Sequence, residues 1–117
     1  SNMTVKSDKK WLKFIVEQLL VNAIKYTEGE NKKVIVSACD SEEGKVLEVK
    51  DQGVGIPKKD IRRVFEPFYT GENGRRFGES TGMGLYLVSK VCKKLGHRIE
   101  IESKPGEGTS VRIIFSG

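Results

Sequence analysis

The chain has 117 residues, a length that suits one domain with a single hydrophobic core. Hydrophobic residues make up 37% of it and charged residues 32%, and its apolar runs are far shorter than the roughly 18 residues that a membrane-spanning helix requires. The net charge of +5 comes from small, scattered basic groups without interleaved aromatic residues, a pattern that disfavours nucleic-acid binding and suits an anionic ligand such as a phosphate.

The N-terminus and the two cysteines indicate the compartment. No charged leader precedes an apolar stretch, so we expect no secretion signal, and Ser1-Asn2-Met3 resembles the remnant of an expression tag. Cys39 and Cys92 lie far apart and neither belongs to a CxxC pair. We therefore expect two free thiols in a reducing compartment rather than a disulfide or a zinc site.

The first predicted element is a long amphipathic helix over Asp8–Tyr26, with Ser7 or Asp8 as its N-cap. Its apolar stripe recurs at helical spacing: Leu12, Ile15, Val16, Leu19, Leu20 and Ala23. On a separate edge of the same helix, Gln18, Asn22 and Lys25 lie within roughly 40° of one another. This polar edge is either a solvated face or a site where amide oxygens ligate a cation such as Mg²⁺ and the ammonium group reaches a phosphate.

Two strands are predicted next, over Lys33–Ala38 and Val46–Lys50, joined as a hairpin by the turn Ser41–Gly44. The second strand ends in Asp51-Gln52-Gly53-Val54-Gly55. Two glycines one residue apart allow a close backbone approach to a flat ligand, and a carboxylate before them can accept a hydrogen bond from an exocyclic amine. A glycine turn at a strand end is also commonplace in proteins without a ligand there.

A short helix is predicted over Lys59–Phe65, followed by a mobile loop over Thr70–Thr81. Thr81-Gly82-Met83-Gly84 then leads into a helix over Gly84–Leu95, which ends at Gly96. Backbone N–H groups at such a helix start can cradle a phosphate. A Walker A loop is excluded because no Gly-Lys-Ser/Thr follows.

The chain closes with two alternating strands around the turn Lys104–Gly108, with these apolar residues on a shared face: Ile99, Ile101, Val111, Ile113 and Phe115. Every predicted strand alternates with a period of two, so the sheet has one buried face and one wetter face. This pattern predicts an α/β two-layer sandwich and disfavours a Rossmann fold. Taken alone, Gly106-Glu107-Gly108-Thr109 is an ordinary hairpin connection.

Five short motifs in this order resemble the N, G1, F, G2 and G3 boxes of sensor histidine kinases: Asn22–Thr27, Asp51–Ile56, Phe65–Phe68, Gly82–Leu85 and Gly106–Thr109. The resemblance runs from Leu12 to Phe115. It implies the Bergerat ATP-binding fold shared with gyrase, Hsp90 and MutL. That fold is an α/β (α+β) two-layer sandwich with a mixed, largely antiparallel sheet and about three helices on one face.

The resemblance implies roles in binding ATP and Mg²⁺. Asp51 would accept a hydrogen bond from the adenine amine, selecting ATP over GTP, and Thr109 would support the same edge through water. Asn22 would hold Mg²⁺, Lys25 would pair with phosphate oxygens, and Tyr26 would pack beside the nucleotide. Gly53 and Gly55 would shape the pocket, and the backbone of Gly82 and Gly84 would contact the phosphates. Three more residues would also bind the nucleotide: Ile56, Thr81 and Leu85.

The F box would anchor a lid at Phe65 and Phe68, in which Arg75 or Arg76 either meets the γ-phosphate or remains an exposed charge. One position departs from the family pattern. Gln18 stands where hydrolytic relatives carry Glu, and because an amide cannot take a proton from water, we expect slow autonomous hydrolysis. Gln18 touches the metal either directly or through water. Glu17 is a rival base, but it points about 100° away round the helix.

Phosphoryl transfer also needs an acceptor, and the single histidine, His97, lacks the following acid of the family's acceptor motif and is expected to be surface or structural. We expect residues 1–10 to be the tag remnant and the end of a preceding dimerisation segment that carries the acceptor, and residues 11–117 to be the catalytic domain. The resemblance implies a monomeric fragment of a homodimeric, membrane-anchored bacterial protein with this domain in the cytoplasm and a response regulator as partner. The alternatives are a serine kinase of the anti-sigma-factor type and a nucleotide-sensing module without catalysis.

Overall fold

The computed structural model describes residues 8–27, 33–69, 71 and 83–115. Within these ranges the elements are α1 (Lys9–Tyr26), β1 (Val34–Ser41), β2 (Gly44–Asp51), α2 (Lys58–Ile61), α4 (Gly84–Leu95), β3 (Arg98–Lys104) and β4 (Gly108–Ile114). The expectations for Ser1–Ser7, for most of the predicted loop, and for Arg75, Arg76, Thr81 and Gly82 lie outside the described residues. Lys9 and Lys10, predicted to end a preceding segment, are the first residues of α1.

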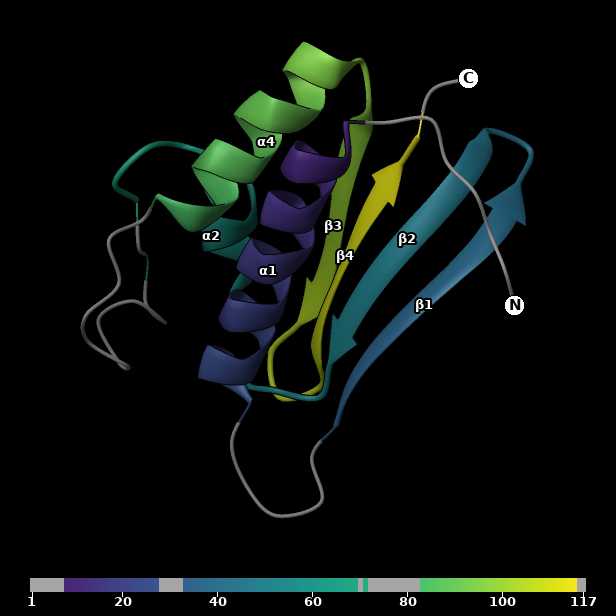
Figure 1. Cartoon of the computed structure of the whole chain (residues 1–117). Helices are drawn as coiled ribbons and strands as arrows, with labels where there is room; N and C mark the ends of the chain where they lie inside the picture. Colours follow the sequence, from purple (N-terminus) through teal and green to yellow (C-terminus); the bar gives the residue numbers. More distant parts are fainter. Residues whose placement is uncertain (1–7, 28–32, 70, 72–82, 116–117) are drawn as a thin grey trace.

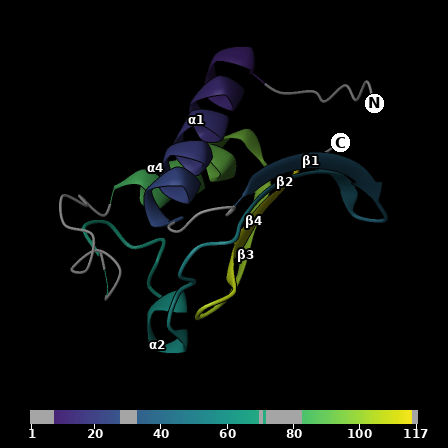
Figure 2. The same ribbon diagram turned by 90° about the horizontal axis from the view of Figure 1, so that it is seen from below.

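The strands form one sheet in the order β1-β2-β4-β3, and each neighbouring pair in it is antiparallel. Helices α1 and α4 lie side by side across one face of the sheet (Figures 1 and 2), while α2 sits beside the β3 end. The predicted two-layer α/β sandwich is therefore confirmed. β2 and β4 are the two central strands of the sheet, and the end of β2 lies beside the start of β4.

The core lies between the helices and the sheet. From α1 it receives Ile15, Leu19 and Ala23, and from α4 it receives Val88 and Cys92, each set at the i, i+4 spacing of one helix face. The sheet contributes Val49, Val111, Ile113 and Phe115. Of these, Val111, Ile113 and Phe115 belong to the alternating set predicted to share a face. In the described ranges, no helix has the length and apolar composition needed to cross a bilayer.

The opposite face of the sheet carries a polar cluster, as the alternation predicted, beside the buried apolar pair Val46 and Ile114. Arg112 of β4 pairs across the strands with Glu48, Glu100 and Glu102. β1 lies at the edge, where Val36 remains 47% exposed although it belongs to the helix-facing set. The helices therefore cover the centre of the sheet and its β3 side better than β1.

The ends of the helices follow local rules. Asp8 caps α1 by accepting hydrogen bonds from the backbone of Lys10 and Trp11, and Gly96 ends α4 with φ at 79°. α2 stops at Ile61, earlier than the predicted Phe65. Hydrogen bonds three residues apart continue the chain as turns, from Arg63 N–H to the Asp60 carbonyl and from Glu66 N–H to that of Arg63. Pro67 disfavours a helical conformation of the residue before it, which opposes a longer helix.

Candidate functional site

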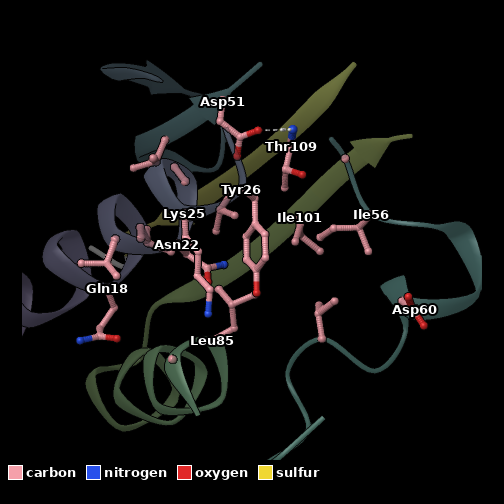
Figure 3. Close-up of a pocket in the computed structure, with 18 of the residues that line it drawn as sticks. Gln18, Asn22, Lys25, Tyr26, Asp51, Ile56, Asp60, Leu85, Ile101 and Thr109 are labelled. Carbon is pink, nitrogen blue, oxygen red and sulfur yellow. Dashed lines mark hydrogen bonds between the residues drawn. The ribbon is translucent and has the colours of Figure 1, made fainter. Parts of the chain in front are cut away.

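A cavity of about 260 Å³ opens between α1, the start of α4 and the adjoining ends of β2 and β4 (Figure 3). The structure brings ten residues predicted from the sequence to its lining: Gln18, Asn22, Lys25, Tyr26, Asp51, Gly55, Ile56, Gly84, Leu85 and Thr109. They come from four separate stretches of the chain. The strand order explains why these residues meet. β2 and β4 are neighbours, and the C-terminal end of α1 lies at the same end of these strands, where Val54 N–H donates to the Tyr26 carbonyl.

Asp51 lies at the end of β2, directly opposite Thr109 in the β2–β4 register. Its side chain is buried, with 7% exposure, and Oδ1 accepts hydrogen bonds from the backbone N–H of Gly53 at 2.8 Å and of Thr109 at 3.2 Å. The other carboxylate oxygen points into the cavity (Figure 3). Oδ1 is thus committed to the backbone, and Oδ2 presents an acceptor to a ligand.

Burial also shifts the pKa of Asp51. Desolvation raises the pKa of this carboxyl above its ordinary value, and the two backbone hydrogen bonds act in the opposite direction. A ligand that donates a hydrogen bond to Oδ2 would favour the charged form further. The site therefore suits a neutral donor, such as an exocyclic amine, better than a ligand acceptor.

The two glycines after Asp51 are required by close backbone contacts. A Cβ on Gly53 would lie 2.2 Å from the Tyr26 carbonyl oxygen, and one on Gly55 would lie 2.1 Å from that of Lys104. No side chain fits at those distances without moving the backbone. Gly53 therefore locks the turn against the end of α1, reinforced by the hydrogen bond from Val54 N–H to the Tyr26 carbonyl, although Gly53 is not itself part of the cavity lining.

The polar edge of α1 faces the cavity rather than open solvent. Gln18, Asn22 and Lys25 all line it, and Gln18 Oε1 lies 3.4 Å from the position that a Cβ on Gly84 would take. Amide oxygens are hard donors, and Mg²⁺ in phosphate sites takes one or two protein ligands and completes its shell with phosphates and water. These residues fit a metal–phosphate group at this end. Glu17 lies outside the lining, and its carboxylate is 3.9 Å from the Lys13 ammonium.

Between the two polar ends the cavity is apolar. Its wall includes core-facing residues of the sheet, namely Val49, Ile101 and Val111. Tyr26 adds an aromatic ring, with the Lys25 ammonium 5.6 Å from the ring centre. An apolar slot with an acceptor at one end and amide and ammonium groups at the other suits a flat heterocycle that carries an anionic tail.

Four residues that the sequence analysis discussed lie outside the cavity lining. Phe68 is absent from the lining, 75% exposed, and has a left-handed backbone with φ at 66°. His97 is buried, and its ring packs edge-on against Phe115 at 4.8 Å, which supports a structural role. Burial lowers the pKa of His97. Cys39 and Cys92 are free thiols, as expected.

Sequence reasoning missed two polar members of the wall, Asp60 and Tyr69. A signal was present for the first, because Ile56, Asp60 and Val64 recur at intervals of four and all three line the cavity. Tyr69 directly follows the aromatic motif that was assigned only to a lid. Its place in the wall depends on tertiary contacts that no local pattern carries.

Comparison with known proteins adds independent evidence. Residues 7–116 match a family model described as histidine kinase-, DNA gyrase B-, and HSP90-like ATPase. Over 111 residues, 95% of this chain, it is 55% identical to sensor histidine kinase YxdK of Bacillus subtilis and 42% identical to sensor protein kinase GraS of Staphylococcus aureus. The chain spans only about a third of these relatives, 34% and 32% of their lengths.

Solved structures agree with the sequence comparison. A mycobacterial sensor histidine kinase, MprB, superimposes with a TM-score of 0.80 at 28% identity, covering 95% of this chain and 73% of that one. The catalytic domain of histidine kinase ThkA, in a nucleotide-free form, gives a TM-score of 0.77 at 27% identity, covering 95% of this chain and 70% of that one. Both likenesses extend over nearly the whole fold described above.

Proposed function

The chain belongs to the family of histidine kinase-, DNA gyrase B- and HSP90-like ATPases, and we propose that its pocket binds Mg-ATP and delivers the γ-phosphoryl group to a histidine outside this chain. The observation that carries the proposal is the single cavity shared by the Asp51 carboxylate and the amide-bearing edge of α1. An acceptor for a purine amine and donors for a metal–triphosphate thus stand at two ends of one apolar slot.

At the purine end, Asp51 Oδ2 would accept a hydrogen bond from the adenine amine. Guanine carries a carbonyl at that position, and two acceptors facing each other in a buried site repel and stay unpaired, so the pocket would prefer ATP to GTP. Thr109 holds the Asp51 carboxylate through its backbone N–H, and its hydroxyl lies 2.8 Å from Ser103 Oγ. It would bind the same adenine edge through water.

At the phosphate end, Asn22 would hold Mg²⁺, and Gln18 would contact the ion either directly or through water. When bound, the metal neutralises charge on the β- and γ-phosphates. Lys25 would pair with phosphate oxygens, and the backbone at Gly84, where α4 begins, would present N–H groups toward them. Arg75 and Arg76 are proposed to act at the γ-phosphate from beyond the described residues.

The residues at the phosphate end of the cavity favour phosphoryl transfer over hydrolysis. Gln18 offers an amide where a base would have to take a proton from water, and Glu17 lies outside the lining. His97 is buried against Phe115 and is a poor acceptor. We propose that the acceptor histidine lies in another part of a longer protein, on a dimerisation segment, as the length of the sensor kinase relatives suggests.

For the whole protein we propose a homodimer anchored in the bacterial membrane, with this domain in the cytoplasm, that passes phosphate from its histidine to a response regulator. Residues 11–117 would form the catalytic domain, which as a fragment would be monomeric. The sensor kinase names of the relatives support this proposal.

The test mixes the chain with a separately produced dimerisation segment of the full-length protein and γ-labelled Mg-ATP. The proposal predicts an acid-labile, base-stable phosphoprotein that disappears when the segment's histidine is replaced. Acid-stable phosphoserine would instead support a serine kinase, and nucleotide binding without any labelled protein would support a sensing module. The Asp40→Asn variant, changed at an exposed carboxylate, is the control.

A further inference from the structure

A second carboxylate lies in the wall of the pocket, at the end opposite Gln18 (Figure 3). Asp60 of α2 is only 4% exposed, and its Oδ1 accepts a hydrogen bond from the hydroxyl of Tyr69, which also lines the cavity. A buried carboxylate is stable only when it is well hydrogen-bonded. Here one of the bonds fixes the ring of a residue that a ligand would touch.

The Tyr69 ring is held from a second side as well. The Arg63 guanidinium lies 4.2 Å from the ring centre, and Arg63 is itself paired with Glu66 at 3.1 Å. The backbone N–H of Tyr69 closes a turn onto the Glu66 carbonyl at 3.4 Å. Three contacts thus converge on Tyr69, two on its side chain and one on its backbone.

The backbone immediately before Tyr69 adopts an unfavourable conformation. Phe68, immediately before Tyr69, has φ at 66°, a conformation that is unfavourable for a bulky residue. Its ring is 75% exposed, so packing of that ring does not compensate. Strained backbone persists where the surroundings over-determine it, and the anchored neighbour here is Tyr69.

We propose that Asp60 is a positioning residue that holds the Tyr69 ring as a wall against the nucleoside part of the bound nucleotide. The inference rests on the proposed ATP site. Asp60 stands away from Gln18, which belongs to the phosphate end, and beside Ile56 of the apolar slot (Figure 3). Tyr69 therefore meets the base and ribose rather than the triphosphate, and it narrows the slot so that a flat ring fits without trapped water.

The test measures the dissociation constants of ATP, ADP and adenosine by calorimetry for Tyr69→Phe and Asp60→Ala, with thermal unfolding of each protein. Loss of the positioning hydrogen bond should weaken all three ligands alike, by about three- to tenfold. The double variant should bind no more weakly than either single one, because both remove the same interaction. Asp60→Asn, whose amide oxygen can still accept from the tyrosine hydroxyl, should restore most of the affinity.

Tyr86→Phe and Asp40→Asn are matched controls outside the cavity lining and should bind as the wild type does. Wild-type affinity in Tyr69→Phe would overturn the inference, even if Asp60→Ala lowers thermal stability or does not fold. A loss confined to ATP, with adenosine unaffected, would also overturn it. Failure of the wild type to bind ATP at all would refute the proposed function instead, so the two failures are distinguishable.

Discussion

Replacing Asp51 by asparagine changes one atom of the pocket in a predictable orientation. Oδ1 accepts two backbone N–H groups, from Gly53 and Thr109, so the amide oxygen must take that place to keep both bonds. The amide NH₂ then occupies the position of Oδ2, which points into the cavity. The substitution therefore turns an acceptor into a donor at the place where the proposed adenine amine, also a donor, would lie.

The expected loss of ATP affinity follows from the hydrogen bond between the adenine amine and Asp51 that the substitution removes. A hydrogen bond to a charged group contributes about 1.5–3 kcal/mol, and an unpaired buried donor costs about 1 kcal/mol or more. The sum of about 2.5–4 kcal/mol corresponds to an ATP affinity weaker by roughly 70- to 1000-fold. Stability should be retained, since both backbone bonds survive and a neutral amide avoids the desolvation that raises the pKa of Asp51.

Calorimetric titration with ATP and GTP measures this prediction, with thermal unfolding as the check on folding. ATP binding should collapse while GTP binding stays level or improves, because guanine offers a carbonyl to the new NH₂ group. Asp40→Asn, on an exposed strand, should bind ATP normally. An Asp51→Asn protein that folds and binds ATP within threefold of the wild type would refute the adenine assignment.

Three further predictions concern other groups. Asn22→Ala should abolish Mg²⁺-dependent phosphoryl transfer yet leave adenosine affinity near the wild-type value, and an equal loss of adenosine affinity would contradict the metal role. The pKa of the Asp51 carboxyl is raised above 3.8 in the folded state. The protonated carboxyl therefore stabilises the folded protein at low pH, and this stabilisation is lost as the pH rises through the folded-state pKa. The stability advantage of Asp51→Asn over the wild type, measured by urea unfolding, should thus grow from about pH 4 toward neutrality, and a constant difference would contradict the direction of the shift. Cys92 is buried, with its pKa raised to about 11, and Cys39 is exposed. A thiol reagent should therefore modify one cysteine in the native protein and both after unfolding, and fast modification of both in the native protein would contradict the described core.

The sequence was sufficient for features with a local cause. The apolar stripe of α1, the Asp8 cap and the Gly96 end were all predictable from spacing and from backbone chemistry. Strand alternation predicted which residues of β3 and β4 face the helices. The pairing of Asp51 with Thr109 also depends on the strand order, which no local pattern predicts; the family resemblance implied only that both residues serve the adenine edge.

Other features depended on contacts between distant segments. The four-residue spacing of Ile56, Asp60 and Val64 indicates that Asp60 faces inward, but its hydrogen bond with Tyr69 depends on how the chain folds between them. The left-handed backbone of Phe68 is likewise set by its anchored neighbour, since its own type disfavours that conformation. The buried place of His97 follows from its packing against Phe115 at the far end of the chain.

The most direct test of the central claim is a crystal structure of the domain with Mg²⁺ and a non-hydrolysable ATP analogue. The claim predicts the adenine amine about 3 Å from Asp51 Oδ2 and the triphosphate between Asn22, Lys25 and the start of α4. A purine bound elsewhere, or one whose amine makes no contact with Asp51, would contradict it.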